Sequence, residues 1–229
     1  MPHKKLVNFA QTLELNLTDA QIGLLRAYAR CVWEKKDFLN LTSAQSLEEI
    51  LLRHICDGMV AAAWIAKKHP EALQVADAGA GCGYIGMTLA VCLPQVQVTL
   101  IESLERRCKF MNWAAMQSNI GNVQIKNVRL GQGTHFQFDV LTERAMGPLV
   151  QIGPLCLSAL KPGGIFLAFQ GEQAPSWGKG TVEENTGLVE KVYAKAKNHY
   201  HLLCGRCFFG ALHFDLCAHQ AAVYSAGDL

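Results

Sequence analysis

Apolar residues recur every three or four positions over the first seventy residues, as they do along helices with one buried face. One series follows Thr18-Asp19-Ala20-Gln21, and a second follows Ser46-Leu47-Glu48-Glu49. Both tetrapeptides match the capping box, in which a hydroxyl and a downstream Glu or Gln accept hydrogen bonds from free backbone N–H groups. The second series continues as a long apolar helix that ends near Pro70. Residues 1–70 are therefore expected to form an N-terminal helical segment packed on the core.

From residue 73 onward, short β-prone runs alternate with helix-like segments, a pattern typical of βαβ units and a parallel sheet. The predicted strands are 73–76, 96–101, 123–128, 138–141 and 165–169, and the helices between them include 85–92 and 106–118. Two further β-prone runs, 200–209 and 211–224, meet at Gly210 and predict an antiparallel hairpin on the edge of the sheet. Residues 71–229 are thus expected to form one α/β domain with a mostly parallel sheet.

Composition supports a globular protein, because half of the 229 residues are hydrophobic and only 17% are charged. The net charge of +2 does not by itself indicate a nucleic-acid binder. No apolar run reaches the length of a membrane span, and the first residues lack the features of a signal peptide. Nine scattered cysteines, an odd number, favour a reduced, cytoplasmic protein over a disulfide framework. No obligate protein partner is evident.

A glycine-rich loop, ADAGAGCGYIG, follows the first predicted strand at residues 76–86. Gly79, Gly81 and Gly83 lack side chains, so their backbone can lie against a ligand at the carboxyl end of the sheet. The stretch fits two motifs: G-x-G-x-x-G from Gly81, which indicates NAD, and D-x-G-x-G-x-G from Asp77, which indicates S-adenosylmethionine.

Charge separates these two cofactors. A pyrophosphate favours backbone donors and a helix N-terminus, whereas an acid at the loop suits the amine and sulfonium of S-adenosylmethionine. Asp77 provides such an acid, although it could also cap the turn. Glu102 ends the second strand, where a carboxylate can accept hydrogen bonds from both ribose hydroxyls. The loop therefore favours S-adenosylmethionine over NAD.

The surroundings of the loop resemble the RsmG (GidB) family, which methylates guanine N7 in bacterial small-subunit (16S) ribosomal RNA. The resemblance covers most of residues 10 to 172. It rests on Asn40-Leu41-Thr42-Ser43, Arg53-His54-Ile55-Cys56-Asp57-Gly58, Asp77-Ala78-Gly79-Ala80-Gly81, Thr99-Leu100-Ile101-Glu102-Ser103-Leu104 with Arg106-Arg107, and Glu143-Arg144-Ala145-Met146.

The resemblance implies a Rossmann-like class I methyltransferase that uses S-adenosylmethionine. Together with the loop, it implies a set of cofactor-binding residues: Asp77, Gly79, Gly81, Gly83, Tyr84 through its backbone, Glu102, Arg129, Leu130 and Arg144. Arg144 is also expected to position the reactants, and Arg53 and His54 to contact the RNA. Guanine N7 attacks through a lone pair and has no proton to remove, so no general base is expected.

Three departures from the family pattern concern the substrate. Gln170 stands where the family has a lysine, Glu143 replaces a serine, and Tyr84-Ile85-Gly86 lacks the usual proline. Losing a lysine and adding a carboxylate beside an RNA site is expected to weaken its attraction for phosphate. Three alternatives therefore stay open: a methyltransferase of the same fold acting on a small molecule or protein, a cofactor-binding ribosome-assembly factor without activity, and, last, an NAD oxidoreductase.

Three further features have two interpretations each. Basic residues cluster at 106–109 and 191–201, as either solvated helix faces or phosphate contacts. Phe169 alternates with core positions and is expected to be buried rather than to stack on a base. Cys204-Gly205-Arg206-Cys207 with nearby histidines suggests zinc, but residues three apart on a strand face opposite sides, so no metal is expected.

Overall fold

The computed structural model describes residues 2–133, 135–171, 207–209, 212–214 and 219–225. In chain order the first elements are α1 (Pro2–Thr12), α2 (Asp19–Leu39), α3 (Leu47–Glu49), the π-helical turn η1 (Ile50–Ile55) and α4 (Cys56–Lys68). They are followed by β1 (Gln74–Ala78), α5 (Tyr84–Cys92), β2 (Gln97–Glu102), α6 (Glu105–Gln117), β3 (Val123–Asn127), β4 (Phe138–Arg144), α7 (Leu149–Ser158), β5 (Leu160–Gly171), β6 (Cys207–Phe209), β7 (Leu212–Phe214) and β8 (His219–Ser225).

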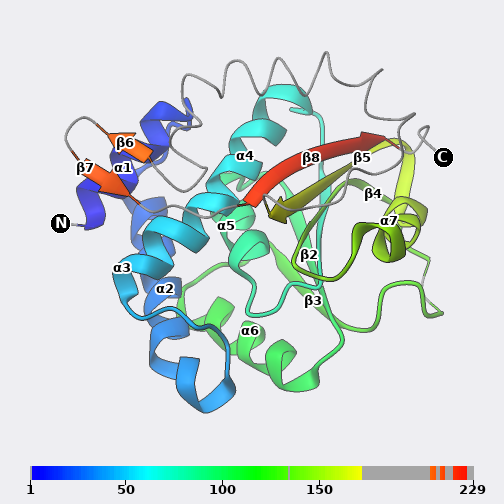
Figure 1. Cartoon of the computed structure of the whole chain (residues 1–229), viewed down its shortest axis with the longest axis horizontal. Helices are drawn as coiled ribbons and strands as arrows, with labels where there is room; N and C mark the ends of the chain where they lie inside the picture. Colours follow the sequence, from blue (N-terminus) through cyan, green and yellow to red (C-terminus); the bar gives the residue numbers. More distant parts are fainter. Residues whose placement is uncertain (1, 134, 172–206, 210–211, 215–218, 226–229) are drawn as a thin grey trace.

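Among the described residues, the main sheet has six strands in the order β3-β2-β1-β4-β5-β8 (Figure 1). The first five are parallel, and β8 runs antiparallel to β5. The predicted fold class is confirmed as an α/β fold with a Rossmann-like, mostly parallel sheet. The strand order reverses between β1 and β4, and ligands of such sheets bind at this switch point beyond the carboxyl ends of the strands. The glycine loop leaves β1 at this point.

The C-terminal strands differ in one respect from the sequence-based expectation. An antiparallel hairpin is present, but β6 and β7 pair with each other in a separate two-stranded sheet. The edge of the main sheet is instead formed by β8, whose residues pair with β5 from Ile165↔Ser225 to Gly171↔His219. The β-prone run 211–224 therefore contributes two strands, not one.

The two faces of the sheet contribute to two different cores, because successive strand residues point to opposite sides. Val140 and Leu167 pack in the core that also contains buried residues of α1, α2, η1, α4, α5 and α6. Leu141 and Phe166 pack with α7 on the other face. Phe169 is 4% exposed in the first core, so the expectation that it is buried is confirmed. The N-terminal helices thus share a continuous core with one face of the sheet.

Some expectations concern residues that the structure does not describe. The basic cluster at 191–201 lies outside the described residues, as do Cys204 and the side chains of Cys207 and the nearby histidines. Within the described residues, no group of three or more His, Cys, Asp or Glu could hold a metal ion. No helix in the same part of the chain is both long and apolar enough to cross a membrane.

Candidate active site

The loop between β1 and α5 is tight on one side and open on the other. Gly79 and Gly81 both have φ of +64°, in the left-handed region that side chains disfavour. A Cβ on Gly79 would lie 2.7 Å from Cγ of Met146, so only glycine fits against the turn after β4. A Cβ on Gly81 would meet nothing closer than the Gly79 carbonyl oxygen at 3.9 Å. The backbone at Gly81 is therefore open to a ligand lying against it, as a cofactor at this loop requires.

Asp77 supports this loop from beneath. Its side chain is buried, and its carboxylate accepts hydrogen bonds from the Gly86 N–H at 2.8 Å and the Thr142 hydroxyl at 3.2 Å. Burial raises the pKa of Asp77 to about 6, opposed by these bonds and by Arg144. The carboxylate thus caps the N-terminus of α5, the alternative role that the sequence left open. Direct contact with a cofactor stays a prediction.

Glu102 closes the other end of the loop. Its carboxylate accepts from the Gly81 N–H at 3.0 Å and from the Leu104 N–H at 2.8 Å, and lies 3.5 Å from the Arg107 guanidinium. Two backbone donors therefore hold it in one orientation at the end of β2. A carboxylate fixed in this way suits two adjacent hydroxyl groups.

Beside Glu102 lies an open hollow of about 410 Å³, at the ends of β2 and β3. Its lining consists of Ser103, Leu104, Asn127, Val128, Arg129 and Gln132. Arg129 is exposed, whereas Leu130 is 7% exposed and packs in the core that contains α7. Arg129, a predicted cofactor-binding residue, thus borders a hollow next to Glu102, the carboxylate predicted to bind the ribose. Leu130 faces the core.

The N-terminal helices hold the same loop from the opposite side. The hydroxyl of Tyr28 on α2, which is fully buried, donates to the carbonyl oxygen of Cys82 at 2.9 Å. The ring of Tyr28 packs edge-on against Tyr84, with centroids 6.4 Å apart. The ring of His54 on η1 stacks on the Tyr84 ring, with centroids 4.4 Å apart and an interplanar angle of 15°. Burial raises the pKa of Cys82 to about 11, so its thiol remains protonated at neutral pH.

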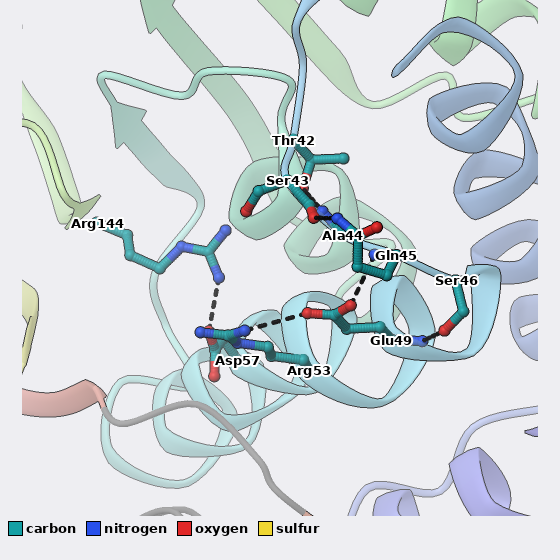
Figure 2. A network of polar contacts seen from close by, with 9 residues as sticks. All are labelled: Thr42, Ser43, Ala44, Gln45, Ser46, Glu49, Arg53, Asp57 and Arg144. Carbon is teal, nitrogen blue, oxygen red and sulfur yellow. Dashed lines mark hydrogen bonds and ion pairs between the residues drawn. The ribbon is translucent and has the colours of Figure 1, made fainter. Parts of the chain in front are cut away.

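Arg144, at the end of β4, reaches across to helix α4 (Figure 2). Its Nη1 lies 2.6 Å from Oδ2 of Asp57, and both side chains are largely buried. Its guanidinium carbon lies 5.4 Å from the centroid of the Tyr84 ring. Arg144, Tyr84 and His54, predicted separately as cofactor and RNA residues, are thus brought together at one end of the glycine loop.

The segment that joins the two family-like stretches 40–43 and 53–58 forms a polar network before α4 (Figure 2). Glu49 pairs with Arg53 at 3.1 Å and accepts from the Gln45 N–H at 2.8 Å. Its own N–H donates to the Ser46 hydroxyl at 3.0 Å, the expected N-terminal cap. Arg53, predicted to contact RNA, therefore has its direction set by the helix that carries it.

Glu143 is not a surface charge, contrary to the expectation from its place in the family motif. It is fully buried and points to the α7 face, because it alternates with Arg144 along β4. Its carboxylate accepts from the Met146 N–H at 3.2 Å, and its charge adds to burial in raising the pKa of the Cys156 thiol. Glu143 therefore shapes the turn after β4 and does not present a carboxylate to RNA. The side chain of Gln170 lies outside the described residues.

Sequence reasoning missed two groups at this site, Tyr28 and Asp57. Tyr28 lies on a helix whose spacing shows only a buried face, and nothing in the pattern marks its hydroxyl as bonded to a loop far along the chain. Asp57 lies inside the stretch that resembles the family, so its position was visible, but its partner on β4 was not. In the basic cluster at 106–109, Lys109 lies 2.8 Å from Glu105 and Arg107 faces Glu102. A phosphate contact by this cluster stays a prediction.

Comparison with known proteins gives a family match over most of the chain. Residues 21–202 match the family described as rRNA small subunit methyltransferase G (GidB). A protein of that name from Limosilactobacillus fermentum is 34% identical over 160 residues, which span 67% of this chain and 65% of that protein. Another from Bacillus cytotoxicus is 31% identical over 186 residues, spanning 78% and 77% of the two chains. The match thus covers just under two thirds of the first relative.

Among solved structures, a SAM-dependent O-methyltransferase from Thermotoga maritima is similar with a TM-score of 0.47 and 19% identity, covering 73% of this chain and 62% of that one. The family match extends from α2, through the glycine loop and the strand ends that carry Glu102 and Arg144, to beyond β5. The chain belongs to the rRNA small subunit methyltransferase G (GidB) family.

Proposed function

We propose that this protein transfers the methyl group of S-adenosylmethionine to N7 of a guanine in small-subunit ribosomal RNA. The observation that carries the proposal is the placement of Gly81, Glu102 and Arg144 around the switch point of the sheet, in a chain of this family. A cytoplasmic location accompanies this substrate.

The residues present fit the cofactor from one end to the other. Glu102 would accept hydrogen bonds from the ribose hydroxyls, and the hollow that contains Arg129 would receive the adenine. The open backbone at Gly81 leaves room for the cofactor to continue across β1 toward β4. The guanidinium of Arg144 suits the carboxylate of the amino-acid end, because planar guanidinium groups pair well with carboxylates.

The chemistry requires positioning more than acid–base catalysis. S-adenosylmethionine, when bound, supplies a methyl group on a positively charged sulfur. The residues of this chain orient the two reactants and tolerate the positive charge that arrives on the purine. Tyr84 and His54, stacked at the amino-acid end of the site, provide a rigid aromatic wall beside the reacting groups. Arg53 and His54 are the proposed contacts to the RNA, whose target base must be unstacked to be reached.

A tritiated-methyl assay tests the proposal. Purified protein is incubated with labelled S-adenosylmethionine and intact small ribosomal subunits, naked rRNA, or an RNA-free protein and metabolite extract. The label is expected in rRNA, in 7-methylguanosine, and the RNA chain should become sensitive to chemical cleavage at that nucleotide. The Glu102→Ala variant should lose at least tenfold in rate, because its ribose acceptor is removed. Label only in protein or small molecules would contradict the proposal, as would cofactor binding without any transfer.

A further inference from the structure

We propose that Asp57 is a positioning residue, which acts through Arg144 to set the amino-acid end of the cofactor site. The inference rests on the proposed function, because it assigns Arg144 to that end. Asp57 belongs to α4, in the N-terminal helical segment, whereas Arg144 ends a strand of the methyltransferase sheet. Their side chains are only 5% and 14% exposed, and the contact is 2.6 Å long. Largely buried pairs of this length hold their partners in one orientation.

The position of Asp57 is fixed by a close approach of two helices. Gly58 faces α5, where a Cβ on it would lie only 2.5 Å from Cβ of Thr88. Any larger residue at this position would push α4 away from α5. Because Asp57 is the adjacent residue, the same contact determines how far its carboxylate reaches toward β4. The pair thus links the spacing of α4 and α5 to the direction of Arg144.

Arg144 lies near two other groups that attract a guanidinium, the Asp77 carboxylate and the Tyr84 ring. It lies close enough to Asp77 to oppose the rise in the pKa of that carboxyl, and its guanidinium carbon is 5.4 Å from the Tyr84 ring. Its Nη1 donates a hydrogen bond to the Asp57 carboxylate, within an ion pair. We expect this ion pair to hold the guanidinium on the α4 side of the loop and not against Asp77. A guanidinium has five N–H donors in a fixed fork, so one held by a carboxylate on one side can also donate to a cofactor carboxylate.

Two probes separate the two ends of the cofactor site. S-adenosylhomocysteine carries the amino-acid end, whereas 5′-methylthioadenosine has the adenosine and sulfur without it. Calorimetric titration of the full-length Asp57→Asn variant is expected to show at least tenfold weaker binding of S-adenosylhomocysteine and unchanged binding of 5′-methylthioadenosine. Arg144→Gln should show the same pattern, and the double variant should bind no more weakly than Arg144→Gln alone. Asp57→Glu should recover part of the loss.

Glu48→Gln is the matched control, since it removes an ion pair between the N-terminal helices, with Lys5 at 2.7 Å, away from the site. It should bind both probes like the unaltered protein. Equal loss of both probes in Asp57→Asn would overturn the proposal, because it would mean general loosening, and so would unchanged binding of both. Additive losses in the double variant would overturn it as well. If the unaltered protein bound neither probe, the proposed function itself would fail.

Discussion

Asp77 holds the glycine loop in place, but burying its charge lowers the stability of the fold. Its carboxylate caps α5 through the Gly86 N–H but is almost fully buried, and burial raises its pKa from 3.8 to about 6. The folded state therefore binds the proton more tightly than the unfolded chain does. By linkage, the stability contributed by this group falls as the pH rises from about 4 to 6. The ionised form is retained at neutral pH despite this cost.

Replacing Asp77 with Asn should reveal that cost. The Asn oxygen can still accept from the Gly86 N–H, while no charge has to be buried. The stability of Asp77→Asn relative to the unaltered protein should increase by about 1 kcal/mol between pH 5 and pH 7.5, in urea unfolding measured at both values. Binding of S-adenosylhomocysteine should nevertheless be lost, because the negative charge beneath the loop is gone.

Asp139→Asn is the control, because the fold lowers the pKa of Asp139 whereas it raises that of Asp77. Partial burial alone would raise the pKa of Asp139, but the Lys161 ammonium and the N–H groups of Gln74 and Leu73 lower it overall. Such a carboxylate stabilises the fold above its unfolded pKa and loses that effect only at lower pH. Asp139→Asn should therefore be less stable by the same amount at pH 5 and at pH 7.5. A constant difference for Asp77→Asn as well would contradict the role of the buried charge.

At the scale of elements, the glycine loop is held between a strand below and helix α2 beside it. Tyr28→Phe removes only the hydroxyl that donates to Cys82 and leaves a buried carbonyl without this donor. Such a loss costs about 1 to 2 kcal/mol. We expect this decrease in the free energy of unfolding, together with a threefold to tenfold weaker affinity for S-adenosylhomocysteine, both measured on the same preparation.

Thr12→Ala gives the comparison for Tyr28→Phe. The Thr12 hydroxyl also donates to a backbone carbonyl, that of Phe9 at 2.7 Å, but at the end of α1. It should lower stability without changing cofactor affinity. If Tyr28→Phe lowered stability in the same way and left affinity intact, α2 would not control the loop.

The elements that the sequence predicts well are those with a regular period. The five parallel strands and the helices α5 and α6 lie where alternation and helical spacing indicate them, with shifts at their ends, such as β1 at Gln74–Ala78 instead of 73–76. Helix α7 was not predicted, because Pro154 and the preceding Gly153 interrupt its pattern. The π-helical turn was also missed, since the apolar run through it continues as in an α-helix.

The candidate site can be derived from the sequence only to the extent that its residues lie in local motifs. The loop glycines, Glu102 and Arg144 are at strand ends, and strand ends converge in this fold. Their partners were not predictable, because Tyr28 and Asp57 meet the loop and β4 only through helix packing. Glu143 was misplaced for a related reason: its neighbour Arg144 faces the site, so alternation turns Glu143 away.

At the scale of the whole molecule, the N-terminal helices and the sheet form one packed unit. Buried residues of α4, such as Met59 and Ile65, lie in the same core as Leu89 of α5 and Leu100 of β2. An isolated fragment of residues 71–229 would expose the apolar face of α5. We therefore propose that residues 1–70 and 71–229 differ in sequence pattern but do not fold independently of each other.

Ile65→Ala tests this unity. The side chain is 1% exposed, and shortening it should cost about 2 to 5 kcal/mol. We expect far-ultraviolet circular dichroism and tryptophan fluorescence to report one coincident urea transition, displaced as a whole in the variant. Ile125→Val, a milder change at a partly buried position on β3, serves as the reference for the shape of the transition. Two separate transitions, only one of them displaced, would show that the segments fold independently.

The π-helical turn Ile50–Ile55 has a consequence for how this chain tolerates change in length. Each residue of an α-helix advances the direction of its side chains by roughly 100°. The turn contains one residue more than an α-helical turn would. The direction of the side chains in α4, set by the contact of Gly58 with α5, is therefore shifted relative to that of Ser46 and Glu49 before the turn. Deleting one residue between Arg53 and Asp57 would leave Glu49 and Arg53 four residues apart, as an α-helical pair requires, but would turn Asp57 relative to them by roughly 100°, away from Arg144. The extra residue thus sets the phase of α4 and with it the side of the helix on which Asp57 lies.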